Sequence, residues 1–233
     1  MTNAAHRRYR VAINAETLAL AWARQEGAPA GSVVVVDHEI SPRGRHGRLW
    51  PHQPQRTAVL AMVWRPAIDA DRADLVWLAA SLGLLAAARS IVSGTDIGLS
   101  WPDALVDPHG ERLGEVRAEV QLGPGRVTSA VVTARFDVQA LGIVDRDAAV
   151  AAMVAGLDVG ASHLATGVDV VCAVYSEACV LTGRRVVARL LPRGTARGTV
   201  RGVDPHGQLE LESATGFVER VSVDSLDHLE VRS

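Results

Sequence analysis

The chain has 233 residues, 48% of them hydrophobic and only 4% aromatic, so it can bury one sizeable core or the cores of a larger and a smaller domain. Its formal net charge of −2 gives no overall positive charge of the kind that is typical of a general nucleic-acid-binding protein. All 24 basic residues are arginine, so any chemistry that needs a lysine amine of this chain is excluded as well.

The N-terminal part of the sequence predicts alternating helices and strands. Residues 13–26 predict a helix that Asn14 or Thr17 opens and Gly27 ends. An aspartate-rich start followed by helical periodicity predicts a long helix over residues 69–92. Three apolar runs predict strands at residues 33–37, 58–65 and 97–101.

The middle of the sequence predicts a β-hairpin followed by two helices. Alternating runs over residues 112–122 and 128–138 are joined by a glycine–proline–glycine turn, which is typical of a hairpin. Helical patterns follow at residues 145–157 and 162–181. The second helix contains Cys172 and Cys179, which its helical rise separates by about 10 Å, so we expect two reduced thiols and no disulfide.

After Gly183 the sequence changes to short strand-like runs separated by turns. The runs lie at residues 184–191, 196–203, 208–212, 217–223 and 226–231. Such a series predicts a small barrel, because closure removes exposed sheet edges. We therefore expect two domains, residues 1–182 and residues 183–233. Arginines give the second domain a basic face, which is either a solvated surface or a binding surface.

Composition also bears on location. The sequence has no run of about 18 uninterrupted apolar residues, which argues against a membrane span. The first residues lack the apolar core of a signal peptide, so a cytoplasmic protein is expected. We therefore expect neither a membrane nor a nucleic acid among its partners.

One loop carries the clearest functional pattern. Arg43, Arg45 and Arg48 are spaced by Gly44 and Gly47 directly after an apolar strand. Such a loop can surround a phosphate or carboxylate with forked guanidinium donors and close backbone approach. Anion or nucleotide contact and a merely solvated basic loop both remain open. The three histidines in this region lack the spacing of a metal site on a regular element.

The ordered motifs of the chain resemble those of the biotin protein ligases. PRGRHGRLW at residues 42–50 matches the family's GRGRxGRxW loop and ends on Trp50, SWPDA at residues 100–104 matches KWPND, and ERLGEVR at residues 111–117 matches RKLAGIL. The segment from residue 183 onward resembles the family's C-terminal domain. The resemblance implies an α+β fold, in which helices flank a mixed sheet and a small SH3-like β-barrel follows. The N-terminal winged helix of regulatory members has no counterpart, so DNA binding is not implied.

The same resemblance implies changes at the reacting positions. Ser100 and Arg112 stand where the family has the two lysines that compensate the charge of the reacting carboxylate and phosphates. Glu115 replaces the glycine beside which the biotin carboxylate lies. Glu115 is interpreted either as a new catalytic or metal group, or as a surface or salt-bridged residue near Arg112 or Arg117.

Further positions of the implied site also differ. Glu16 stands in the segment that contacts the ureido ring, and Glu39 or Ile40 replaces a glutamine before the arginine loop. Arg135 replaces an adenine-side glycine of the family's GxGIN motif. Asp103 is a weak candidate for holding Mg²⁺. Trp50 and Trp101 are interpreted either as core anchors or as ligand platforms.

Three hypotheses follow. The first is a pseudoenzyme that has lost ordinary biotinylation and acts by binding an active ligase, the carrier domain of a carboxylase, or a second copy through the central sheet. The second is an ATP-dependent ligase that activates a different carboxylic acid through an acyl-adenylate. The third is an atypical biotin–carboxylase ligase. ATP and Mg²⁺ remain candidate cofactors, whereas the changed positions argue against biotin.

Overall fold

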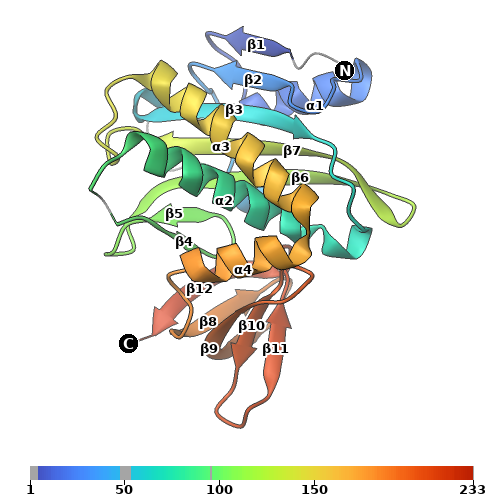
Figure 1. Cartoon of the computed structure of the whole chain (residues 1–233), viewed down its shortest axis with the longest axis vertical. Coiled ribbons are helices and arrows are strands. Elements are labelled where there is room, and N and C mark those ends of the chain that lie inside the picture. Colours follow the sequence, from blue (N-terminus) through green and yellow to red (C-terminus); the bar gives the residue numbers. More distant parts are fainter. Residues whose placement is uncertain (1–4, 48–53, 95, 233) are drawn as a thin grey trace.

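The computed structural model describes residues 5–47, 54–94 and 96–232. A seven-stranded sheet forms the centre of the larger part, in the order β1-β2-β3-β7-β6-β5-β4 (Figure 1). β1 pairs parallel with β2, and every other pairing in this sheet is antiparallel. Its strands are β1 (His6–Tyr9), β2 (Val33–Val36), β3 (Thr57–Trp64), β4 (Gly98–Ser100), β5 (Ala104–Val106), β6 (Arg112–Gly123) and β7 (Arg126–Asp137).

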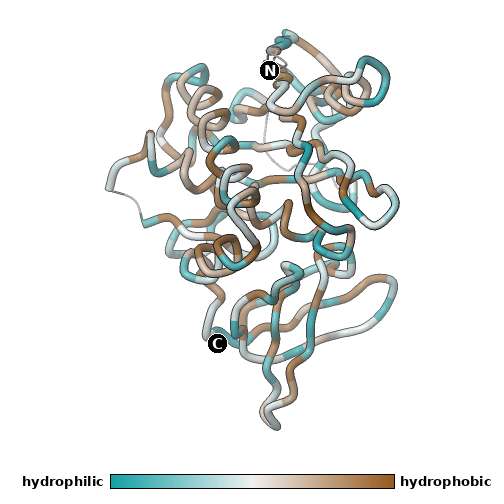
Figure 2. Tube along the Cα trace, turned by 45° about the vertical axis from the view of Figure 1, so that its right-hand side comes forward, coloured by the Kyte–Doolittle hydropathy of each residue, from teal (hydrophilic) through white to brown (hydrophobic). Residues whose placement is uncertain are grey.

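The two faces of the sheet are covered differently. Two long helices, α2 (Asp74–Ile91) and α3 (Arg146–Thr166), pack over one face and bury the main apolar core there (Figure 1). The opposite face is covered only partly, by α1 (Ala15–Gln25), which packs on apolar side chains of β2 and β3. Brown, apolar segments run through the central strands and helices, and teal segments gather at the turns (Figure 2). The rest of the second face is therefore available to polar side chains.

Most sequence predictions for this part are confirmed. The Asn14 side chain caps α1 by accepting a hydrogen bond from the Thr17 backbone N–H at 2.8 Å. The long helix over residues 69–92 is present as α2, preceded by a short 3₁₀ turn (Ala70–Arg72). The hairpin of β6 and β7 forms as predicted. Strands β1 and β5 were not predicted.

The predicted break between residues 157 and 162 is wrong. α3 is continuous, begins after its cap Asp145 and ends before Gly167, where α4 (Val168–Ala178) starts. Gly156 and Gly160 lie inside α3 because they permit close contact with α2. A Cβ added at Gly156 would lie 2.3 Å from the Gly83 carbonyl oxygen, and one at Gly160 would lie 2.2 Å from that of Ala79. These glycines serve helix packing.

The smaller part is a five-stranded antiparallel sheet in the order β11-β10-β9-β8-β12, which confirms the five predicted strands. They are β8 (Arg185–Leu190), β9 (Thr195–Val203), β10 (Leu209–Glu212), β11 (Val218–Val221) and β12 (Leu226–Arg232). Its apolar side chains join the main core. The Trp101 indole N–H donates to the Gly207 carbonyl at 3.3 Å, and Asp74 accepts from the Val223 N–H at 2.9 Å. The two parts are thus packed directly against each other.

Two helices in the described part of the chain, α2 and α3, are long and apolar enough to cross a membrane by length and composition alone. Within the protein, 72% of the apolar window of α2 and 39% of that of α3 are buried. α2 is accordingly the more deeply buried of the two helices, packed against the sheet, α3 and α4. Cys172 and Cys179 on or next to α4 are free thiols, as predicted.

Candidate functional site

The candidate site lies on the sheet face that α1 leaves uncovered. Sheet register places Ser100 opposite Ala104, Ala104 opposite Glu115, and Glu115 opposite Arg135. Residues directly opposite each other on neighbouring strands point to the same face. Four strands therefore bring these positions into one row across the sheet, although they come from motifs that are distant in sequence.

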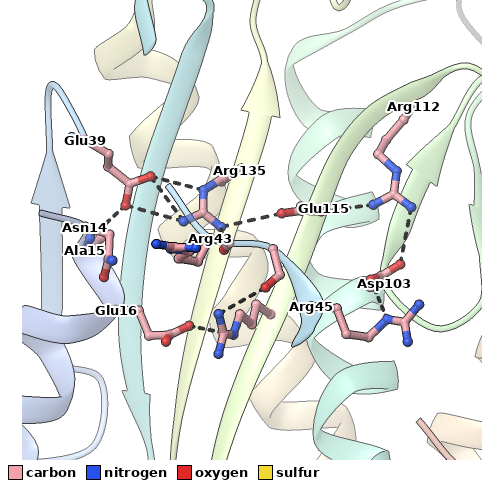
Figure 3. Close-up of polar contacts among 12 residues, drawn as sticks. Asn14, Ala15, Glu16, Glu39, Arg43, Arg45, Asp103, Arg112, Glu115 and Arg135 are labelled. Carbon is pink, nitrogen blue, oxygen red and sulfur yellow. Dashed lines mark hydrogen bonds and ion pairs between the residues drawn. The ribbon is translucent and has the colours of Figure 1, made fainter. Parts of the chain in front are cut away.

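Arg135 is the most deeply buried cation of the row, with 0% of its surface exposed. Its guanidinium donates to the Glu39 carboxylate, with Nε and Nη2 at 3.2 and 3.1 Å from Oε2. It also donates to the Arg43 carbonyl at 3.0 Å. Glu39 accepts a further bond from the Ala15 N–H at the start of α1, at 2.7 Å. Strand β7, helix α1 and the arginine loop are thus joined at one point (Figure 3).

Glu115 is next in the row and is 3% exposed. Its Oε2 accepts a hydrogen bond from Arg112 at 2.9 Å, and its Oε1 lies 3.6 Å from the Arg135 guanidinium. Burial raises the pKa of Glu115 to about 8, although both arginines favour the charged form. The interpretation of Glu115 as paired with Arg112 is confirmed, whereas its interpretation as a surface residue is wrong.

Asp103 continues the contacts toward the five-stranded sheet. It is 5% exposed, and its two carboxylate oxygens lie 3.2 Å from Nε of Arg45 and 3.6 Å from Nη2 of Arg112. Carboxylates and guanidinium groups therefore alternate along one path, which we call the ion-pair chain (Figure 3). Its members are Glu39, Arg135, Glu115, Arg112, Asp103 and Arg45. Their formal charges cancel when all are ionised, and protonation of Glu115 leaves a charge of +1.

A second acid–base pair lies beside the ion-pair chain. Nε of Arg117 is 2.9 Å from the Glu16 carboxylate, and Nη1 donates to the Gly44 carbonyl at 3.0 Å. Burial is the main cause that raises the pKa of Glu16, and the nearby arginines oppose it. The sequence analysis named Arg117 only as a neighbour of Glu115. Its same-face spacing with Glu115 on β6 is the signal that identifies it as a site residue.

The arginine loop is held from both sides. Arg117 and Arg135 bind its carbonyls at Gly44 and Arg43. Arg45 donates to the carbonyls of Leu226 and Asp227 at the start of β12, which ties the loop to the five-stranded sheet. His46 has a left-handed φ of 55°, and its Nε2 lies 2.6 Å from the Leu226 carbonyl oxygen. Residues 43–46 of the loop are therefore held by contacts with other side chains and with β12.

Other predicted site residues have different surroundings. The exposed Arg43 donates to the Gly47 carbonyl at 2.8 Å and forms no ion pair among the described residues. Ser100 is half-buried at the end of the row. Trp101 is 2% exposed and belongs to the core, so the structure favours the anchor interpretation over the ligand platform. Arg48 and Trp50 lie outside the described residues.

The metal prediction for Asp103 is not supported by its surroundings. Both of its oxygens face arginines, which repel a cation. Within the described ranges, no group of three or more His, Cys, Asp or Glu side chains is arranged to hold a metal ion. Glu39 faces the site, while Ile40 is exposed, so Glu39 is the residue at the position expected for glutamine.

Comparison with known proteins agrees with this architecture. Residues 181–225 match the biotin protein ligase C terminal domain family. The chain is 26% identical over 106 residues to the bifunctional ligase/repressor BirA of Bacillus subtilis and to that of Bacillus spizizenii. This match covers 45% of the chain and 32% of each relative, so it spans about a third of the length of these curated proteins.

Structural similarity extends over nearly the whole chain. The biotin protein ligase from Aquifex aeolicus in complex with biotin and ATP gives a TM-score of 0.71 at 14% identity and covers 98% of this chain and 99% of that one. A biotin protein ligase-like protein of unknown function from a Silicibacter species gives 0.73 at 15% identity and covers 95% of both. The chain has a biotin protein ligase-like fold.

The biotin protein ligase-like fold confirms the predicted class, a mixed sheet flanked by helices followed by an SH3-like domain. A biotin acetyl coenzyme A carboxylase synthetase from Helicobacter pylori with bound biotinylated ATP is also similar, with a TM-score of 0.64 at 12% identity over 94% of this chain and all of that one. At such identities the similarity establishes the fold. The chemistry of the site therefore has to come from its own residues.

Proposed function

We propose that this biotin protein ligase-like chain has lost ordinary biotinylation and acts as a binding protein. The single observation that carries the proposal is the ion-pair chain, in which the buried Glu115 and Arg135 lie directly opposite each other on neighbouring strands. Long side chains fill positions that the resemblance assigns to glycines beside the ligand. Protonation of Glu115 changes the charge of the row and leaves its volume unchanged.

Charge supports the same conclusion. The family's reaction brings a carboxylate and a nucleotide phosphate together, so it needs excess positive charge fixed at the reacting atoms. Here each guanidinium of the ion-pair chain already faces a carboxylate, and the sequence supplies no lysine. Loss of one preorganised donor slows a reaction by about 100- to 1000-fold. Several such losses together would reduce biotin adenylation below a useful rate.

A binding role requires the ligase-like fold and its surfaces but no catalytic residues. We propose a cytoplasmic protein whose partner is the carrier domain of a carboxylase, an active ligase, or a second copy that pairs through the central sheet. Of the sites that the resemblance assigns to ATP and Mg²⁺, the nucleotide side is kept in part through Arg43, whereas Asp103 already pairs with Arg45 and Arg112. ATP is therefore proposed as a ligand, and adenylation is not.

One observation favours a second candidate, an ATP-dependent ligase for a different carboxylic acid. Oε1 of the buried Glu115 accepts no hydrogen bond from any described residue, and Glu16 is a second carboxylate with restricted exposure. Buried carboxylates of this kind would bind an ammonium or guanidinium group of a ligand. Pyrophosphate release from ATP, screened over carboxylic acids with and without a cationic group, tests this candidate.

The main proposal is tested with purified protein, biotin, ATP, Mg²⁺ and a biotin-accepting carrier domain, with acceptor biotinylation followed by streptavidin blotting. An active ligase assayed in parallel shows that the acceptor is competent. The proposal expects no biotinylated acceptor above the protein-free background, together with a complex between the chain and one of the three partners in size-exclusion chromatography. Catalytic production of biotinylated acceptor would overturn the proposal.

A further inference from the structure

A cavity lies away from the candidate site. It has a volume of about 600 Å³ and is bounded by the end of β3, the segment that precedes β2, and the C-terminal half of α3. The arginine loop precedes the start of β3, so the cavity lies at the opposite end of this strand. Met62 and Trp64 also belong to the core on the helix-covered face, whereas the ion-pair chain lies on the other face. The two sites are therefore separate.

The inner wall of the cavity is apolar. Met62, Trp64 and Leu164 are between 1% and 5% exposed and form this wall. Ala161 and Ala165 of α3 also line the cavity, and their small side chains leave its volume open. The Trp64 indole N–H donates to the Met62 sulfur at 3.2 Å, which is a weak acceptor. A ligand with an apolar body fits this surface and could offer a better acceptor.

One cation and one anion also line the cavity, and they come from different walls. Arg65 at the end of β3 is exposed and donates from Nη2 to the Ala28 carbonyl at 2.8 Å, which leaves its other N–H groups available. Asp158 on α3 is exposed, and its carboxylate forms no ion pair with any described residue. Arg65 likewise pairs with no described carboxylate. The cavity is thus lined by an apolar wall and by two side chains of opposite charge, for which no ion pair is found among the described residues.

From this arrangement we infer that the cavity binds a small zwitterion with an apolar body. A free apolar amino acid and a short apolar peptide share this chemistry. The ligand carboxylate contacts Arg65, its ammonium contacts Asp158, and its side chain covers Met62 and Trp64. The volume is within the range of about 300–1,000 Å³ that is typical of small-molecule sites. This binding is independent of the proposed function of the ion-pair chain.

Isothermal titration of the whole protein with L-phenylalanine and with L-phenylalanyl-L-leucine tests the inference and distinguishes the two sources. We expect saturable 1:1 binding of at least one of them. N-acetyl-phenylalanine, which lacks the ammonium, and phenylalaninamide, which lacks the carboxylate, should bind at least about tenfold more weakly, because each leaves one charged side chain without its partner.

Variants locate the binding. Ala161→Trp fills the cavity and should abolish the heat of binding, whereas Ala148→Trp, at an exposed position of α3 outside the cavity, should leave it unchanged. Arg65→Gln and Asp158→Asn alter exposed side chains and should therefore fold. Each should weaken binding at least about tenfold, so the inference stays testable even if Ala161→Trp does not fold. No saturable heat with either zwitterion, or equal binding by Arg65→Gln and Asp158→Asn, would overturn the inference.

Discussion

Replacement of Arg135 by methionine is expected to lower the free energy of unfolding by about 3–5 kcal/mol, the typical cost of removing one partner of a buried ion pair. The guanidinium is fully buried and donates to both the Glu39 carboxylate and the Arg43 carbonyl. Its loss leaves Glu39 and Glu115, at 4% and 3% exposure, without their shared cation. The loss is a large fraction of the about 5–15 kcal/mol that stabilises a typical domain.

Urea unfolding at pH 7, followed by circular dichroism, measures this loss. Arg201→Met is the matched control, since Arg201 and Glu212 form an ion pair at 3.7 Å with both side chains exposed, and it should change stability by less than about 1 kcal/mol. The double variant Arg135→Met/Glu39→Gln should be more stable than Arg135→Met alone, because it removes the uncompensated charge and keeps an acceptor for Ala15. A loss below about 1 kcal/mol for Arg135→Met would refute the reasoning.

Three further predictions concern proton binding, helix packing and the loop. Burial raises the pKa of Glu115 from 4.5 to about 8, so between these pH values the folded protein keeps a proton that the unfolded chain releases, and its stability falls as pH rises. Glu115→Gln should flatten this dependence of stability on pH in urea unfolding. An unchanged dependence would contradict the prediction. Gly160→Ala places a Cβ 2.2 Å from the Ala79 carbonyl oxygen and should cost about 1–3 kcal/mol in thermal unfolding, with the exposed Ala155→Leu as a near-neutral control. Arg45→Met removes the tie to β12, so hydrogen exchange of residues 226–232 should be faster, and equal exchange would show that the tie is unimportant.

Local signals in the sequence predicted most of the elements. Asn14 was one of two predicted caps of the first helix, beside Thr17, and the structure shows Asn14 as the cap. Period-two alternation on both sides of a glycine-containing turn predicted the hairpin. Both signals depend only on neighbouring residues. The break assigned inside α3 shows the limit of local rules. Gly156 and Gly160 indicate a helix end when read alone, but the backbone of α2 lies directly against them, and that contact is not visible in their local sequence.

The sequence predicted most of the individual residues of the candidate site but not the ion pairs between them. The resemblance to the biotin protein ligase motifs placed Arg112, Glu115 and Arg135 at site positions that normally hold other residues. Whether they join in the ion-pair chain depends on the register between β6 and β7 and on the path of the arginine loop, and no single motif encodes either of these. Similarly, the role of Trp101 as a core anchor depends on its hydrogen bond to Gly207, which lies more than a hundred residues later in the sequence.

The central claim is that the protein's own ion pairs occupy the place of the reacting ligands. Titration of the purified chain with biotinyl-5′-adenylate tests this claim most directly, since this compound combines both halves of the family's ligand and requires no catalysis. The account predicts no saturable heat up to about 1 mM ligand, while an active ligase binds in the same buffer. Saturable 1:1 binding at micromolar or lower concentration would contradict it.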